Sequence, residues 1–387
     1  MSGFNLRTVD PYQVLFPLGI LHALVGTSVW ILFALRFTTY PGQSHPHHMI
    51  GGFLFSFAAG FMMTAIPKFT GSAPSSRREL FLATLLSVGS LLFSTPLLTL
   101  GMLIFISIFF VRRFLARSFS PPPHFLFLPI GLCLGILGAT LLFLVETKSI
   151  SSSYANAGKL CLYYGTMLSF LLGIGAKLIS ALLGWAAPPT HRIEPAQAAK
   201  NTRKIFLTKW SSAALQATLF LTGFWVEIEL NPSLGRGLRA VCATWIAMQS
   251  WRLYRLPRAP GKLPFWIWVA AWILLLGLWT HTLFPALGVH AAHLVFIGGF
   301  GLMTLLIASR VVLAHGGYSL ELESKSRIYA TAAILVLAAA ATRVVSLWTS
   351  SLYQHFAYAA ALWILAVMLW SAFFLPKMLR GILVRAE

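Results

Sequence analysis

The chain has 387 residues, of which 58% are hydrophobic and only 10% are charged. Soluble domains carry about 25% charged residues, so this composition indicates an integral membrane protein and excludes an ordinary soluble enzyme. The net charge of +20 does not indicate nucleic-acid binding, because the basic residues lie in short segments between long apolar runs, as they do in membrane proteins.

The apolar runs are long and continuous, which predicts membrane-spanning α-helices and not the alternating strands of a barrel. Windows of about 20 residues place twelve helices in an all-α transmembrane domain that covers residues 1–387. In chain order we expect helices at 13–36, 47–66, 78–94, 95–111, 124–145, 157–185, 205–228, 238–254, 264–284, 290–313, 327–348 and 352–375. The third and fourth helices are short and meet at Pro96.

The basic residues predict how these helices are oriented. Most of the 29 Lys and Arg residues fall in the two terminal segments and in one set of alternate loops. Such a bias marks the cytoplasmic side of a membrane protein. We therefore expect both termini to be cytoplasmic, and the even-numbered helices to enter the membrane from the opposite, outer side.

Seven of the eleven histidines fall at the outer edge of the membrane in this topology. They are His45, His47, His48, His281, His290, His293 and His355. Neutral imidazole binds iron, copper and zinc, so this concentration predicts a metal or haem protein. A single histidine at a membrane edge more often binds water or lipid headgroups, but three within four residues favour the metal interpretation.

The histidines at the start of the second helix are the densest group. Pro46 interrupts the helix start, so His45, His47 and His48 are expected to fan toward one point. Gly51 and Gly52 follow one turn below. On a helix they would leave room for a flat porphyrin beneath the histidines.

The tenth helix repeats this arrangement. His290 and His293 are three residues apart and therefore share one face, with Gly298, Gly299 and Gly301 below them. The glycines suit either a porphyrin or close helix packing. Two histidines from different helices can ligate one haem iron from both sides. The expected ligands are therefore His47 or His48 with His290 or His293, while His281 and His355 lie at a depth that suits a second metal.

Ionisable residues inside the membrane usually face a cavity or a partner. His22 is expected to line a channel to the metal or to be a hydrogen-bonded packing residue. Lys177 is expected to meet a haem propionate or to extend to the cytoplasmic interface. No CxxCH motif is present, so any haem is non-covalent and of the b type. No acidic residue lies within a predicted span, which disfavours a proton- or cation-coupled transporter.

Two stretches of the chain resemble signatures of the NnrS family. One is His-Pro-His-His-Met at 45–49 followed by Gly-Phe-Met-Met-Thr-Ala-Ile-Pro-Lys-Phe-Thr-Gly at 60–71, and the other runs from His293 to Gly316. The positions that match the family are His45, His47, His293, Arg310 and His315. The resemblance implies a twelve-helix bacterial inner-membrane protein that carries haem b and copper and is linked to nitric oxide and nitrosative stress.

Haem–copper oxidases and nitric oxide reductases also have twelve-helix cores with haem histidines on helices two and ten, so we expect a related helix arrangement. The leading hypothesis is a haem protein, with or without copper, that binds or reduces nitric oxide with an unknown electron donor. Nitric oxide is small and neutral, which suits spans without acidic residues. The alternatives are a metal or haem transport protein with an outer histidine loading site, and a non-catalytic membrane sensor.

Overall fold

The computed structural model describes residues 9–185 and 195–383, and within these ranges it contains helices and connecting segments but no strand. Every one of the twelve predicted segments is helical. The long elements are α1 (Pro11–Ala34), α3 (Phe55–Thr70), α4 (Arg77–Phe93), α5 (Pro96–Leu115), α6 (Phe127–Glu146), α8 (Met167–Leu182), α9 (Pro195–Glu229), α10 (Pro232–Ile246), α11 (Lys262–Leu283), α13 (Leu302–His315), α15 (Ile328–Val345) and α16 (Leu352–Leu383).

In the described part of the chain, nine helical segments are long and apolar enough to cross a membrane. They account for nine of the twelve predicted spans. The other three predicted spans form α4, α9 and α10. Helix α4 has 17 residues, and α10 has 15 and includes Arg236 and Arg239, so neither is both long and apolar enough to qualify. The chain is thus a multi-pass helical membrane protein.

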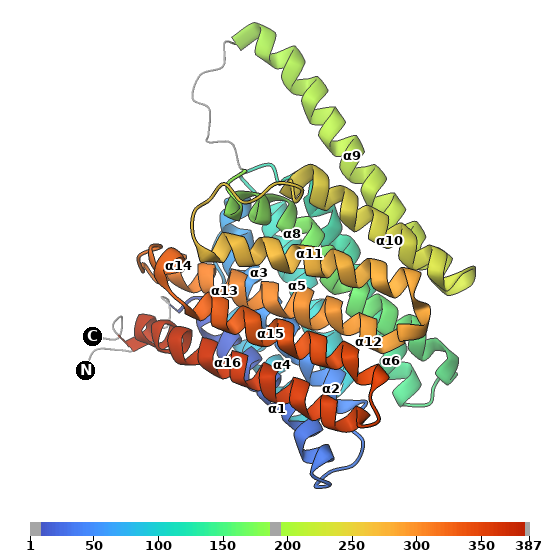
Figure 1. Ribbon diagram of the computed structural model, residues 1–387. Coiled ribbons are helices and arrows are strands. Elements are labelled where there is room, and N and C mark those ends of the chain that lie inside the picture. Colours follow the sequence, from blue (N-terminus) through green and yellow to red (C-terminus); the bar gives the residue numbers. More distant parts are fainter. Residues whose placement is uncertain (1–8, 186–194, 384–387) are drawn as a thin grey trace.

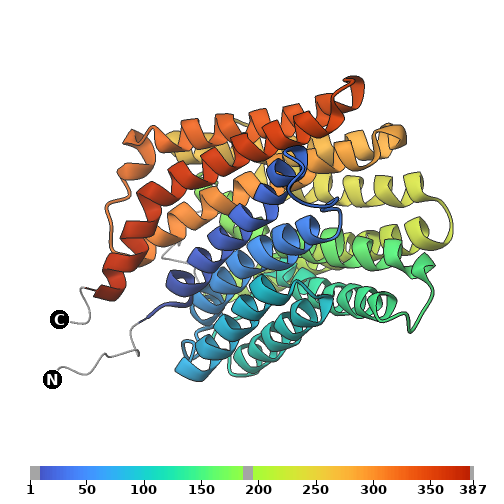
Figure 2. The same ribbon diagram turned by 90° about the horizontal axis from the view of Figure 1, so that it is seen from below.

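The first and last helices lie side by side, and the two views show them running along each other (Figures 1 and 2). The Gln13 side-chain amide near the start of α1 donates a hydrogen bond to the Met378 carbonyl in the last turns of α16, at 3.0 Å. The chain therefore enters and leaves the bundle at one end. That end is the one expected to be cytoplasmic.

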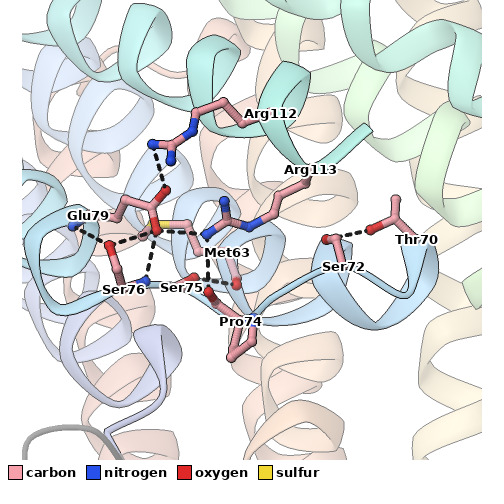
Figure 3. Close-up of polar contacts among 9 residues, drawn as sticks. All are labelled: Met63, Thr70, Ser72, Pro74, Ser75, Ser76, Glu79, Arg112 and Arg113. Carbon is pink, nitrogen blue, oxygen red and sulfur yellow. Dashed lines mark hydrogen bonds and ion pairs between the residues drawn. The ribbon is translucent and has the colours of Figure 1, made fainter. Parts of the chain in front are cut away.

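The predicted division of residues 78–111 into two short helices is confirmed. Helix α4 ends at Phe93 and α5 starts at Pro96, so the two form an antiparallel hairpin. Glu79 in the first turn of α4 pairs with Arg112 at 3.6 Å and with Arg113 at 2.7 Å near the end of α5 (Figure 3). Ser76 caps α4, and its hydroxyl and backbone N–H both donate to the same carboxylate.

Three helices are the most deeply buried of the candidate spans: residues 44–70, 152–182 and 285–315. Each is built in the same way. A short helix (α2, Ser44–Pro46; α7, Ala155–Lys159; α12, Gly288–His293) leads into a π-helical segment and then into a long α-helix. The π-helical segments are η2 (His47–Leu54), η5 (Leu160–Thr166) and η8 (Leu294–Gly301). These inner helices are the second, sixth and tenth of the predicted series. This regular spacing is a repeat that the sequence did not reveal.

Two of the inner helices, α3 and α13, contact each other near the end of the bundle where the chain enters. Toward the opposite end, where η2 and η8 lie, a cavity separates them. We call this opposite end the histidine end, because His45, His281, His293 and His355 all lie there. The helix arrangement therefore places the predicted second and tenth helices as neighbours with space between their histidine-bearing segments.

Candidate functional site: a histidine-lined cavity

A cavity of about 770 Å³ opens at the histidine end of the bundle. Its volume lies in the range of about 300–1,000 Å³ that is typical of ligand and cofactor sites. All three π-helical segments of the inner helices contribute to its wall, and π-helical turns are frequent at functional sites. Aromatic side chains form much of the lining: Trp30, Tyr40, Phe53, Tyr163, Tyr164, Phe296, Phe356 and Trp363.

Two of the predicted ligands, His45 and His293, line this cavity and lie close together. Their ring centroids are 6.5 Å apart and the ring planes differ by 14°. His45 Nδ1 donates to the Gly26 carbonyl at 2.6 Å, and His293 Nδ1 donates to the Val289 carbonyl at 2.6 Å. A carbonyl can only accept, so each Nδ1 carries the proton. In each neutral ring Nε2 therefore keeps its lone pair.

This is the arrangement that metal-binding histidines use, in which the second ring nitrogen donates to a carbonyl and thereby fixes the tautomer and the ring orientation. Neither Nε2 atom has a hydrogen-bond partner among the described residues. The two rings are nearly parallel, with their centroids 6.5 Å apart.

The cavity wall is also positively charged. Lys159, Arg236 and Arg343 line it, and Glu227 is the one carboxylate among the lining residues. Arg343 is 7% exposed and its guanidinium lies 3.5 Å from the centre of the Phe356 ring. The excess of positive charge suits a ligand that carries carboxylates.

His290 does not line the cavity but holds Arg343 in place. Its Nδ1 lies 2.9 Å from Arg343 Nη1 and 3.2 Å from the Ser346 hydroxyl. Of the two histidines predicted as alternative ligands, His293 lines the cavity, whereas His290 contacts the neighbouring Arg343.

The other side of the cavity is formed by α9, α10 and α11. His281 stacks on Tyr164 with ring planes 18° apart, and its Nδ1 lies 3.5 Å from the Tyr164 hydroxyl. Glu227 bridges Arg236, at 3.2 Å, and the buried Arg239. This group of arginines and tyrosine was not identified from the sequence, because its members come from helices far apart in the chain.

The expectation that His45, His47 and His48 converge on one point is wrong. His47 Nε2 lies 3.2 Å from the Ser90 hydroxyl of α4. His48 is buried, and its Nδ1 lies 3.2 Å from Nδ1 of His22. The three imidazoles therefore point in different directions, and of the three only His45 lines the cavity. His22 matches the alternative interpretation of a hydrogen-bonded packing residue.

The expectation that Gly51 and Gly52 leave room for a porphyrin is also wrong. A Cβ on Gly52 would overlap the His22 ring, and a Cβ on Gly51 would come within 2.7 Å of the Thr99 hydroxyl. Both glycines permit close packing against α1 and α5. The same holds in η8, where Gly298 packs against Ile273 and Gly301 against Trp363.

Two further predicted residues lie away from the cavity. Lys177 is exposed, with its ammonium 5.4 Å from the Phe69 ring near the end of α3, which is the opposite end of the bundle. The expected contact with a haem propionate does not fit this position. His355 contacts Tyr358, and its buried Nδ1 has no partner in the described part of the protein. Across the described ranges, no three His, Cys, Asp or Glu side chains are grouped as a metal site.

The remaining family-matched residues lie at the end where the chain enters the bundle. Arg310 pairs with Glu323 in α14 (Leu322–Lys325). Burial raises the pKa of the Glu323 carboxyl above its ordinary value, and Arg310 opposes this rise. His315 Nδ1 lies 3.0 Å from the Lys68 ammonium and the ring contacts Tyr12. These residues tie α3, α13 and the following loop together.

A family model described as NnrS protein matches residues 8–381 of the chain. A search of curated proteins found no match. The family match covers the cavity and all seven histidines predicted at the outer edge.

Proposed function

The chain belongs to the NnrS family, and we propose that it is a b-type haem protein of the membrane that binds or reduces nitric oxide. The observation that carries the proposal is the pair of His45 and His293. Both Nδ1 atoms are held by backbone carbonyls, and neither Nε2 atom has a hydrogen-bond partner among the residues that the structure describes. A haem held there would supply a one-electron iron centre.

The rest of the cavity supports a porphyrin as the occupant. Its aromatic wall offers apolar surfaces to a flat ring, and Arg343 and Arg236 in that wall would supply positive partners for carboxylates. The residues of this chain perform distinct tasks. The carbonyls of Gly26 and Val289 orient the imidazoles. The arginines would hold the carboxylates of the haem, and the aromatic side chains would exclude water.

His45 and His293 would together hold the haem, and its iron would be the atom that binds nitric oxide. The two histidines lie in different local structures. His45 is one residue from Pro46, in a three-residue helix, whereas His293 ends a longer helical segment. We propose that His45 would be held less firmly than His293 and would be the more readily displaced of the two.

Copper has weaker support than haem. No grouping of three ligating side chains is present among the described residues, so the metal-transport alternative also lacks a loading site there. We propose the bacterial inner membrane as the location, because the family resemblance and the basic loops both favour it.

The test is an absorption spectrum of detergent-purified protein, oxidised and dithionite-reduced, with and without nitric oxide. We expect a reduced b-type band that changes when nitric oxide is added. A haem band that nitric oxide leaves unchanged would support the sensor or structural alternative. A colourless, folded protein from haem-replete cells would reject the haem assignment.

A further inference from the structure

A second, smaller cavity lies deeper in the bundle, next to the first. Its volume is about 120 Å³, and Leu54 lines both cavities. The three inner helices that form the first cavity also form the second, one or two turns farther along. On the second helix the wall passes from Ile50 to Leu54 and then to Ala58.

The other two inner helices follow the same course. From the tenth helix, Phe296 faces the first cavity, and Phe300 and Thr304 face the second. From the sixth, Tyr163 lines the first cavity and Met167 the second. The small cavity therefore continues the large one along the three inner helices, away from the histidine end.

The lining determines what this cavity can hold. It consists of Phe, Leu, Ile, Met, Ala and Gly side chains, and Thr304 is the one polar residue among them. A buried water needs two to four polar partners, so water is disfavoured. An engineered apolar cavity of about 150 Å³ stays dry and binds xenon or benzene. At about 120 Å³ this cavity is well below the roughly 300 Å³ at which pockets for drug-sized ligands begin.

We propose that this cavity is a binding site for a small, neutral, apolar gas molecule beside the histidine-lined cavity. It would concentrate the gas next to Leu54, which separates it from the His45–His293 pair. The identification of nitric oxide as the natural occupant rests on the proposed function, whereas the capacity to bind a gas atom rests on the size and chemistry of the wall alone.

The experiment uses xenon as the probe and the purified full-length protein. Xenon binding is located by diffraction under xenon pressure and quantified by xenon NMR. Two filling variants, Ala58→Leu and Ala308→Leu, each place a larger side chain in the wall. Ala314→Leu, on the exposed side of α13, is the matched control. Thermal unfolding of all variants is followed in parallel, so that a filling variant that fails to fold is recognised and the other is used.

We expect xenon between α3, α8 and α13 in the unchanged protein and in Ala314→Leu, and loss of that site in a folded filling variant. Absence of xenon there in the unchanged protein, or an acyl or detergent chain in its place, would overturn the proposal. Xenon binding does not require haem. An empty cavity under xenon would therefore contradict this proposal alone, whereas a missing haem band would contradict the proposed function.

Discussion

At the scale of single residues, the site depends on which histidines face the cavity. His45 and His293 do, while His47 contacts Ser90 on α4. We expect His45→Ala and His293→Ala each to remove a large part of the bound haem or change its spectrum, because each deletes one of the two proposed ligands. His47→Ala is the matched control and should keep the spectrum. Haem content per protein by pyridine haemochrome measures the effect, and equal loss in all three variants would contradict it.

Arg343 gives a second prediction at this scale. A hydrogen bond to a charged group is worth about 1.5–3 kcal/mol, so Arg343→Gln should weaken haem binding roughly ten- to hundred-fold. The control is Arg327→Gln, an exposed residue just before the same helix. Competition with apomyoglobin for haem measures the affinity. Unchanged affinity in Arg343→Gln would show that Arg343 does not hold the cofactor.

The sequence was sufficient to identify the candidate histidines but not to choose among them. In η2 the backbone bonds run to the fifth residue, which rotates side chains relative to a regular α-helix. The side-chain directions expected from α-helical spacing are therefore wrong for His47 and His48. Arg236 and Arg343 could not be identified, because their approach to the cavity depends on how distant helices pack.

At the scale of elements, the glycines of the inner helices set how closely the helices approach. Gly52→Ala places a methyl group on the His22 ring, and overpacking of a core typically destabilises by about 1–3 kcal/mol. Gly89→Ala in α4 is the control, because its new Cβ would lie 3.4 Å from Leu98, an ordinary contact. We expect a lower midpoint of thermal unfolding for Gly52→Ala alone. A midpoint equal to that of the control would refute the close approach of α1 and η2.

The hairpin of α4 and α5 offers a further test. Glu79 is the shared partner of Arg112 and Arg113, and the Arg113 side chain is 8% exposed. Loss of one member of a buried ion pair destabilises a protein by about 3–5 kcal/mol. This pair lies at the open end of the hairpin, so we expect a smaller loss of stability here. Glu79→Gln should lower the unfolding midpoint, whereas Glu321→Gln, in an exposed pair with Lys325, should leave it nearly unchanged. Equal midpoints would contradict this role for Glu79.

At the scale of the whole molecule, hydropathy predicted the helical membrane class and all twelve helical segments, since apolar length decides both. It did not reveal that the second, sixth and tenth helices form the centre, because burial among helices and exposure to lipid favour the same apolar residues. Nine helices in the described ranges meet the requirements of a membrane span. The orientation stays a prediction from the basic residues.

That orientation can be tested by labelling intact cells with a membrane-impermeant maleimide. In a Cys133→Ser background, which removes the one exposed cysteine in the described part, Lys148→Cys should react from outside. Arg117→Cys, at the opposite end of the bundle, should react only after the membrane is permeabilised. The reverse pattern would invert the predicted topology.

The central proposal is that His45 and His293 would together ligate one haem. Electron paramagnetic resonance of the oxidised, purified protein tests it most directly, because two imidazole ligands make a ferric haem low-spin. The account predicts a low-spin signal that becomes high-spin in His45→Ala and in His293→Ala and stays low-spin in His47→Ala. A high-spin signal in the unchanged protein, or a low-spin signal that survives both substitutions, would contradict it.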